Sequence, residues 1–97
     1  MKTIAVIESC DTKYKEAKFI SDFIKNEGLK ALVINTATGP APSYNYDISR
    51  EEIAESYGTP WQEMEPKSKG EKIDFMKEAV ASYVVKLYEE GKIDGII

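Results

Sequence analysis

Hydrophobic positions form three short continuous runs along the chain, at Thr3 to Glu8, Ala31 to Asn35 and Ile93 to Ile97. The runs are rich in β-branched residues and do not alternate with polar ones. Continuous apolar runs of this length are typical of strands buried on both faces of a parallel sheet. The pattern therefore predicts three strands separated by helical segments.

The first helical segment is predicted from about Thr12 to Asn26, with Gly28 as its terminator. Its apolar residues recur every three or four positions and define one stripe, formed by Ala17, Ile20, Phe23 and Ile24. Such a stripe is expected to face the sheet, because an amphipathic helix buries its apolar side.

The longest helix is predicted from about Gly70 to Glu90, closed by Gly91. Ser68 followed three residues later by Glu71 is a capping box, in which each residue satisfies a backbone amide of the other. The apolar face is expected to contain Ile73, Met76, Val80, Val84 and Leu87.

Two short helices are predicted before it, Arg50 to Tyr57 and Pro60 to Met64. Ser49 with Glu52 and Thr59 with Gln62 repeat the capping spacing. Pro60 is expected at the first helical position, where its missing N–H does no harm.

These elements predict an α/β fold: a Rossmann-like parallel sheet with crossover helices, in one domain over residues 1–97. About three strands are thin for such a sheet, since five or six are usual. The chain also stops inside the third predicted strand, at Ile97. We therefore expect an incomplete sheet, the first half of a longer amino-terminal domain.

Composition and net charge exclude several classes of partner and of site. The formal net charge of −4 argues against a nucleic-acid partner, because binding to phosphate backbones depends on excess Lys and Arg. No apolar run approaches the ~20 residues that span a bilayer, and none is long enough for a signal peptide. The chain has one cysteine, Cys10, and no histidine, which excludes an internal disulfide, a zinc site and a Cys-His or Ser-His pair. We expect a cytoplasmic protein with no membrane partner.

The first candidate site follows the first strand, at Asp11, Thr12 and Lys13. Ligands of α/β proteins bind outside the carboxyl ends of parallel strands. Lys13 and the amides at the helix start would attract a phosphate. Alternatively, Asp11 only caps the helix and Lys13 is solvated. We expect the neighbouring Cys10 to be buried and inert.

The segment from Thr36 to Asp47 has no periodicity and contains Thr38 and Gly39. Long loops in compact domains are usually functional or mobile. It forms either the second wall of a cleft shared with residues 11–13 or a proline-stiffened connection whose tyrosines pack over the sheet. We expect Tyr57 and Trp61 to form a hydrophobic corner, and residues 67–70 to be a solvated charge run rather than an anion nest.

Five short motifs in register resemble the amino-terminal region of the ATP-binding family named for the tomato mosaic virus resistance protein. They are Cys10 to Lys13 with Glu16, Thr38 to Pro40, Asp47 to Ala54, Lys69 to Glu71 with Met76, and Leu87 to Ile96. The resemblance implies a two-lobed Rossmann-like domain that binds ATP and is often dimeric. In the plant member this domain binds a viral replication protein and blocks RNA replication.

The resemblance implies a nucleotide site at Asp11, Thr12, Lys13, Thr38 and Gly39. Two departures limit it: the family's glycine-rich segment would follow Ile97, and Ser9-Cys10 stands where the family has Gly-Thr. We therefore expect an ATP-binding domain fragment, with or without magnesium, and no identified catalytic residue. The alternative is a protein-interaction module using Tyr44 to Met64. An open sheet edge further predicts a homo-oligomer.

Overall fold

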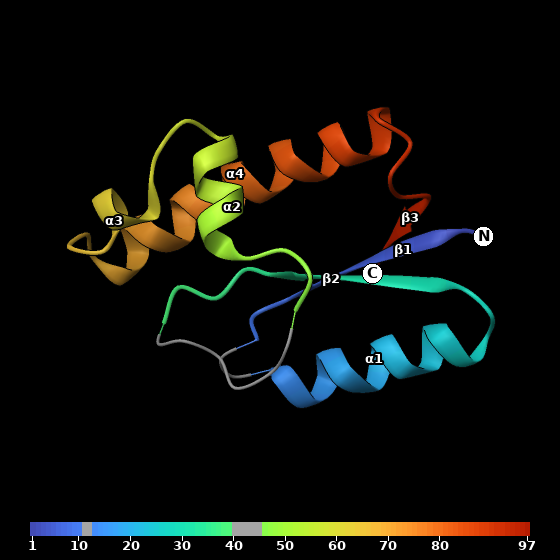
Figure 1. Cartoon of the computed structure of the whole chain (residues 1–97). Helices are drawn as coiled ribbons and strands as arrows, with labels where there is room; N and C mark the ends of the chain where they lie inside the picture. Colours follow the sequence, from blue (N-terminus) through green and yellow to red (C-terminus); the bar gives the residue numbers. More distant parts are fainter. Residues whose placement is uncertain (11–12, 40–45) are drawn as a thin grey trace.

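The computed structural model describes residues 1–10, 13–39 and 46–97 of the chain. Three parallel strands form one sheet in the order β2-β1-β3. The strands are β1 (Thr3–Glu8), β2 (Lys30–Asn35) and β3 (Gly95–Ile96), and the helices are α1 (Tyr14–Asn26), α2 (Arg50–Ser56), α3 (Trp61–Met64) and α4 (Lys69–Glu89). Helix α1 covers one face of the sheet and the other helices lie on the opposite side (Figure 1). The predicted α/β fold with three parallel strands is thus confirmed.

The central strand β1 has unequal neighbours. It pairs with β2 over its whole length, from Thr3 opposite Lys30 to Glu8 opposite Asn35. Its pairing with β3 covers only two register positions. The strand predicted from Ile93 to Ile97 is shorter in the structure, where it covers Gly95–Ile96, although the N–H groups of Asp94 and Ile97 still donate to carbonyl groups of β1.

Two hydrophobic cores flank the sheet. The core under α1 contains Val6, Cys10, Ala17, Ile24 and Val33. The larger core on the other face is built by β1, β2 and helices α2 to α4, and contains Ala5, Ile34, Ile53, Ala54, Trp61, Met64, Met76, Ala79, Leu87 and Ile93. Cys10 is fully buried, as predicted.

The predicted apolar stripes are partly wrong. On α1 the buried residues are Ala17, Ser21 and Ile24, whereas the Phe23 side chain is 59% exposed. On α4, Ala79 is buried and Ile73 is 46% exposed. The buried positions of α1 thus include two small side chains, Ala17 and Ser21, beside Ile24, and those of α4 include Ala79 beside Met76 and Leu87.

The starts of α2 and α4 follow the predicted capping chemistry, whereas α1 begins after Lys13 and has no side-chain cap among the described residues. Ser68 and Glu71 form the reciprocal capping box of α4, and Ser49 accepts the Glu52 N–H at the start of α2. At α3, however, Pro60 is the capping residue rather than the first helical one, and no side chain caps the helix. The extended backbone of Pro60, with ψ of 139°, excludes it from the helix.

Gly28 and Gly91 end their helices as predicted, with φ of +79° and +73°. Both values lie in the left-handed region, where a residue without Cβ is preferred. Trp61 is buried, as expected for the hydrophobic corner, while Tyr57 is partly exposed and packs edge-on against Phe75. Among the described residues, no helix is both long and apolar enough to cross a membrane.

Candidate functional site

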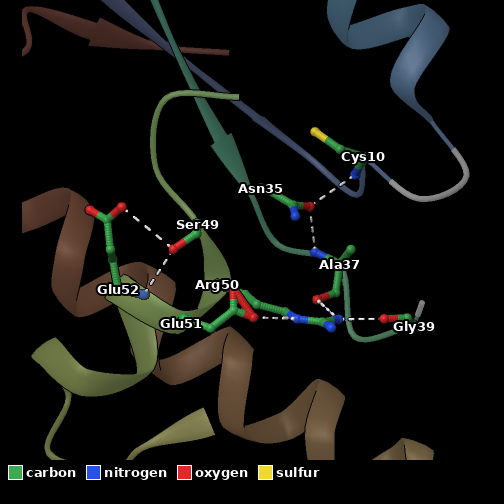
Figure 2. Close-up of polar contacts among 8 residues, drawn as sticks. All are labelled: Cys10, Asn35, Ala37, Gly39, Ser49, Arg50, Glu51 and Glu52. Atoms are coloured by element: carbon green, nitrogen blue, oxygen red, sulfur yellow. Dashed lines mark hydrogen bonds and ion pairs between the residues drawn. The ribbon is translucent and has the colours of Figure 1, made fainter. Parts of the chain in front are cut away.

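The carboxyl ends of β1 and β2 are tied together by one buried side chain. Asn35 is the last residue of β2, and its Oδ1 accepts the backbone N–H of Cys10 at 3.1 Å and that of Ala37 at 2.9 Å (Figure 2). A buried amide oxygen that accepts two backbone donors fixes both segments, because neither donor finds water there. The segments leaving the two strands therefore keep a defined spacing.

A second anchor comes from the opposite side of the same edge. The guanidinium of Arg50, the first residue of α2, donates to the carbonyl oxygens of Ala37, at 3.0 Å, and Gly39 (Figure 2). It also pairs with Glu51 at 3.0 Å and lies 4.7 Å from the ring centre of Trp61. The planar, multidentate guanidinium suits this combination of carbonyl and aromatic partners. Arg50 is thus a structural clamp on residues 37–39.

An open cleft of about 470 Å³ lies beside this anchored edge. One side is formed by residues that follow β1 and β2, and the other side by one face of α4. The lining residues are Ser9, Thr36, Thr38, Lys69, Ile73, Met76, Lys77 and Val80. The volume lies within the usual range of small-molecule sites, about 300–1,000 Å³.

The chemistry of the cleft is divided between its sides. The strand side presents the hydroxyls of Ser9, Thr36 and Thr38, and α4 contributes two ammonium groups, from Lys69 and Lys77. The apolar part of the lining comes from the same helix and consists of Ile73, Met76 and Val80. None of the described lining residues is acidic. The cleft therefore favours an anionic ligand with an apolar part.

A smaller hollow of about 340 Å³ adjoins the Arg50 clamp. It is lined by Thr38, Gly39, Arg50, Trp61, Glu65 and Lys72. Because Arg50 already donates to two carbonyl groups and a carboxylate, this hollow has less unused donor capacity than the cleft. Thr38 lines both and separates them.

The structure places some of the predicted site residues at the cleft or the adjoining hollow and others away from both. Thr38 lines the cleft, and Gly39 lines the adjoining hollow and is held by Arg50. Lys13 is exposed at the start of α1 and is not part of the cleft lining. Asp11 and Thr12 lie outside the described residues. Their role in ligand binding stays a prediction.

Four important residues at this edge were not identified from the sequence as site residues. In the sequence, Asn35 is only the polar end of an apolar run, and Arg50 resembles an ordinary surface residue in the first turn of a helix. Lys69 was assigned to a solvated charge run, and Lys77 has no motif around it. The useful signal was the i, i+4, i+8 spacing of Lys69, Ile73 and Lys77, which places them along one side of α4.

Two further properties, metal binding and the shifted pKa of Tyr83, do not change this description of the cleft. Among residues 1–10, 13–39 and 46–97, no group of three or more His, Cys, Asp or Glu is arranged to hold a metal ion. The pKa of Tyr83 is raised because burial disfavours its phenolate and the nearby Glu52 carboxylate adds to the effect. Tyr83 is not a lining residue, so this shift does not affect the ligand chemistry of the cleft.

The chain is an α/β domain with an open cleft at the carboxyl edge of its parallel sheet. Comparison with protein families gives its place: residues 2–97 match the sequence model described as "Uncharacterised protein family (UPF0261) N-terminal domain". The chain belongs to this family.

Several bacterial relatives carry the same family name. A UPF0261 protein of Clostridium tetani (strain Massachusetts / E88) is 32% identical over 97 residues, which is 99% of this chain and 24% of the relative. UPF0261 proteins of Brucella suis biovar 1 and Brucella melitensis biotype 1 are each 30% identical over 95 residues, 97% of this chain and 23% of theirs. The chain thus spans about a quarter of the length of these relatives. No solved structure matches it.

These findings correct the family assignment made from sequence motifs. The chain is a UPF0261 amino-terminal domain, not a member of the ATP-binding family named for the tomato mosaic virus resistance protein. The motifs behind that resemblance are short turns and helix caps, which the geometry of α/β units favours in many proteins. Any proposal of nucleotide binding must therefore rest on the cleft itself.

Proposed function

We propose that this domain binds a nucleotide, with ATP as the first candidate, in the cleft between the carboxyl edge of the sheet and α4. The observation that carries the proposal is the composition of the cleft lining, which combines two lysines, three hydroxyl residues and three apolar residues. A nucleotide has the matching parts, since its phosphates are anionic and its base is flat and largely apolar. The site also lies where ligands of open parallel sheets bind.

Each part of the lining has a distinct task in this proposal. The ammonium groups of Lys69 and Lys77 would neutralise phosphate charge, and the hydroxyls of Thr36 and Thr38 would donate to phosphate or ribose oxygens. Ile73, Met76 and Val80 would pack against the base. Lys13, with Asp11 and Thr12, is kept as a sequence-based candidate for a further phosphate contact.

We propose binding alone and assign no hydrolytic step to this domain. The described cleft lining offers no carboxylate or histidine that could act as a general base. Magnesium would accompany the phosphates as part of the nucleotide complex, because the described residues provide no cluster of acidic ligands for it. The cytoplasm, where ATP is abundant and a lone cysteine stays reduced, is the compartment we propose.

Calorimetric titration of ATP, with and without magnesium, tests the proposal. Each phosphate ion pair that is lost should weaken binding by about 10- to 100-fold, so Lys69→Ala and Lys77→Ala are the informative variants. Lys86→Ala is the matched control, because Lys86 lies on the same helix but outside the cleft lining. Lys13→Ala tests the sequence-based candidate separately.

Titrating adenosine and inorganic triphosphate in the same way separates the contribution of the nucleoside from that of the phosphates. We expect triphosphate to lose affinity in both lysine variants and adenosine to lose affinity in Ile73→Ala, because the Ile73 side chain lines the cleft and is 46% exposed. Absence of ATP binding by the wild-type chain, or equal loss in Lys86→Ala, would contradict it. The interaction-module alternative would then be the remaining expectation from the sequence.

A further inference from the structure

Two phenylalanines are exposed next to each other on α1. The Phe19 side chain is 73% exposed and that of Phe23 is 59% exposed. They lie four residues apart, so they are neighbours on the helix surface. Among the described elements, α1 is the one helix on its side of the sheet, and its outer surface is turned away from the other elements (Figure 1). Because they adjoin, they form one apolar patch on the outer surface of α1 rather than two isolated exposed residues.

Charged residues continue the same row in both directions. At four-residue spacing the row reads Lys15, Phe19, Phe23 and Glu27, and all four are exposed. A positive residue therefore stands at one end of the aromatic pair and a negative residue at the other. We call this row the α1 ridge.

The α1 ridge is complementary to itself when reversed. A two-fold axis passing through the helix at position 21 would place Phe19 opposite the partner copy's Phe23, and Lys15 opposite the partner copy's Glu27. Both pairs would occur twice, as in any isologous interface. A parallel arrangement would instead bring lysine to lysine and glutamate to glutamate, which is unfavourable.

We infer that the α1 ridge is a dimer interface, and that its partner is a second copy of this chain packed with the opposite helix direction. Ridges of residues four apart interdigitate in the commonest class of helix packing, at a crossing angle of about −50°. A hollow of about 340 Å³ lined by Lys15, Glu16, Phe19 and Ile20 lies beside the ridge. It is positioned to receive the partner's Phe23 ring.

Sedimentation equilibrium of the 97-residue chain tests this inference. The wild-type chain should form a dimer, and Phe19→Asp should weaken the dimer at least about tenfold, because an aromatic contact is lost twice. Val85→Asp is the control, since Val85 is also an exposed apolar residue but lies on α4. Circular dichroism melts of each variant verify that the monomer stays folded, as expected for exposed positions.

Charge exchange tests the direction of the helices. Lys15→Glu and Glu27→Lys should each weaken the dimer, and the double variant should restore it, because the opposite charges are again paired across the axis. Three results would overturn the inference: a monomeric wild-type chain at millimolar concentration, a dimer insensitive to Phe19→Asp, or a double variant as weak as the single ones. A dimer disrupted by Ile96→Asp instead would place the contact at the β3 edge.

Discussion

Asn35 and Cys10 are joined by a single hydrogen bond, from the backbone N–H of Cys10 to the Asn35 Oδ1 at 3.1 Å, across the carboxyl ends of neighbouring strands. The same oxygen also accepts the N–H of Ala37. Both Asn35 and Cys10 are almost fully buried. The backbone N–H of Cys10 therefore cannot replace the Asn35 oxygen by water. The side chain of Asn35 thus connects the two segments that form the strand side of the cleft.

Replacing Asn35 with alanine should destabilise the domain by about 1–3 kcal/mol, because two buried N–H groups lose their acceptor. Urea denaturation followed by circular dichroism measures the change. Asn26→Ala is the control, since Asn26 is exposed at the end of α1 and should change the free energy of unfolding little. Equal effects of the two substitutions would show that the buried acceptor is unimportant.

Arg50→Lys should lower stability although the charge is kept. A lysine has a single compact ammonium group and cannot reach both carbonyl oxygens while lying flat on Trp61. We expect a loss of about 1–3 kcal/mol. Trp61 is the only tryptophan in the chain, so its fluorescence reports the loss of the clamp directly.

The matched control for Arg50 is Glu51→Gln, which removes the carboxylate of a half-exposed ion pair and leaves the carbonyl contacts in place. Such pairs contribute little, about 0–1 kcal/mol. If Glu51→Gln were as damaging as Arg50→Lys, the ion pair rather than the carbonyl clamp would hold residues 37–39.

Ser21→Ala should stabilise the domain. The Ser21 hydroxyl is buried on the sheet side of α1 and has no hydrogen-bond partner among the described residues. Removing an unsatisfied buried hydroxyl recovers its desolvation cost, and alanine also has the higher helix propensity, so a gain of about 1 kcal/mol is expected. A lower thermal midpoint would instead indicate that the hydroxyl bonds to the helix backbone.

Ser68→Ala should cost about 1 kcal/mol, because it removes the acceptor for the Glu71 N–H at the start of α4. Glu71→Gln should have a smaller effect, since glutamine also completes a capping box. Thermal unfolding of the two variants gives the comparison. Because α4 also carries Lys69, fraying of its first turn should weaken ATP binding as well.

Asp22 makes the stability of the fold depend on pH. Its hydrogen bond and ion pair with Lys18, at 2.8 Å, hold its pKa below the ordinary value of 3.8. A carboxyl whose pKa is lower in the folded state stabilises the fold above pH 3.8, and this contribution disappears as the pH falls through the folded value. NMR titration should show the pKa of Asp22 rising in Lys18→Gln; an unchanged value would exclude Lys18 as the cause.

The elements of the fold could be predicted because they depend on local patterns. The bounds of β1 agree with the prediction, and Ser68 and Gly91 define α4 to within one residue. These signals are contained in a few neighbouring residues. The exposure of the Phe23 side chain was not predictable from neighbouring residues, because it depends on how closely α1 approaches the sheet.

The candidate site was predictable only in its location. The carboxyl edge of the sheet and Thr38 follow from the order of elements. The contributions of Asn35, Arg50 and Lys77 depend on contacts between segments that lie 11 to 25 residues apart or more along the chain. Motif order also led to the wrong family, since capped helices and strand-end turns recur wherever α/β units do.

Thr3 and Asp94 hold each other by two bonds, with the Thr3 N–H donating to the Asp94 carboxylate and the Asp94 N–H donating to the Thr3 carbonyl, both at 2.8 Å. These partners are 91 residues apart in the chain. At about 5–20 residues per second, β1 is synthesised roughly 5–20 s before its second neighbour, β3. One edge of the central strand therefore stays unpaired until β3 has been made.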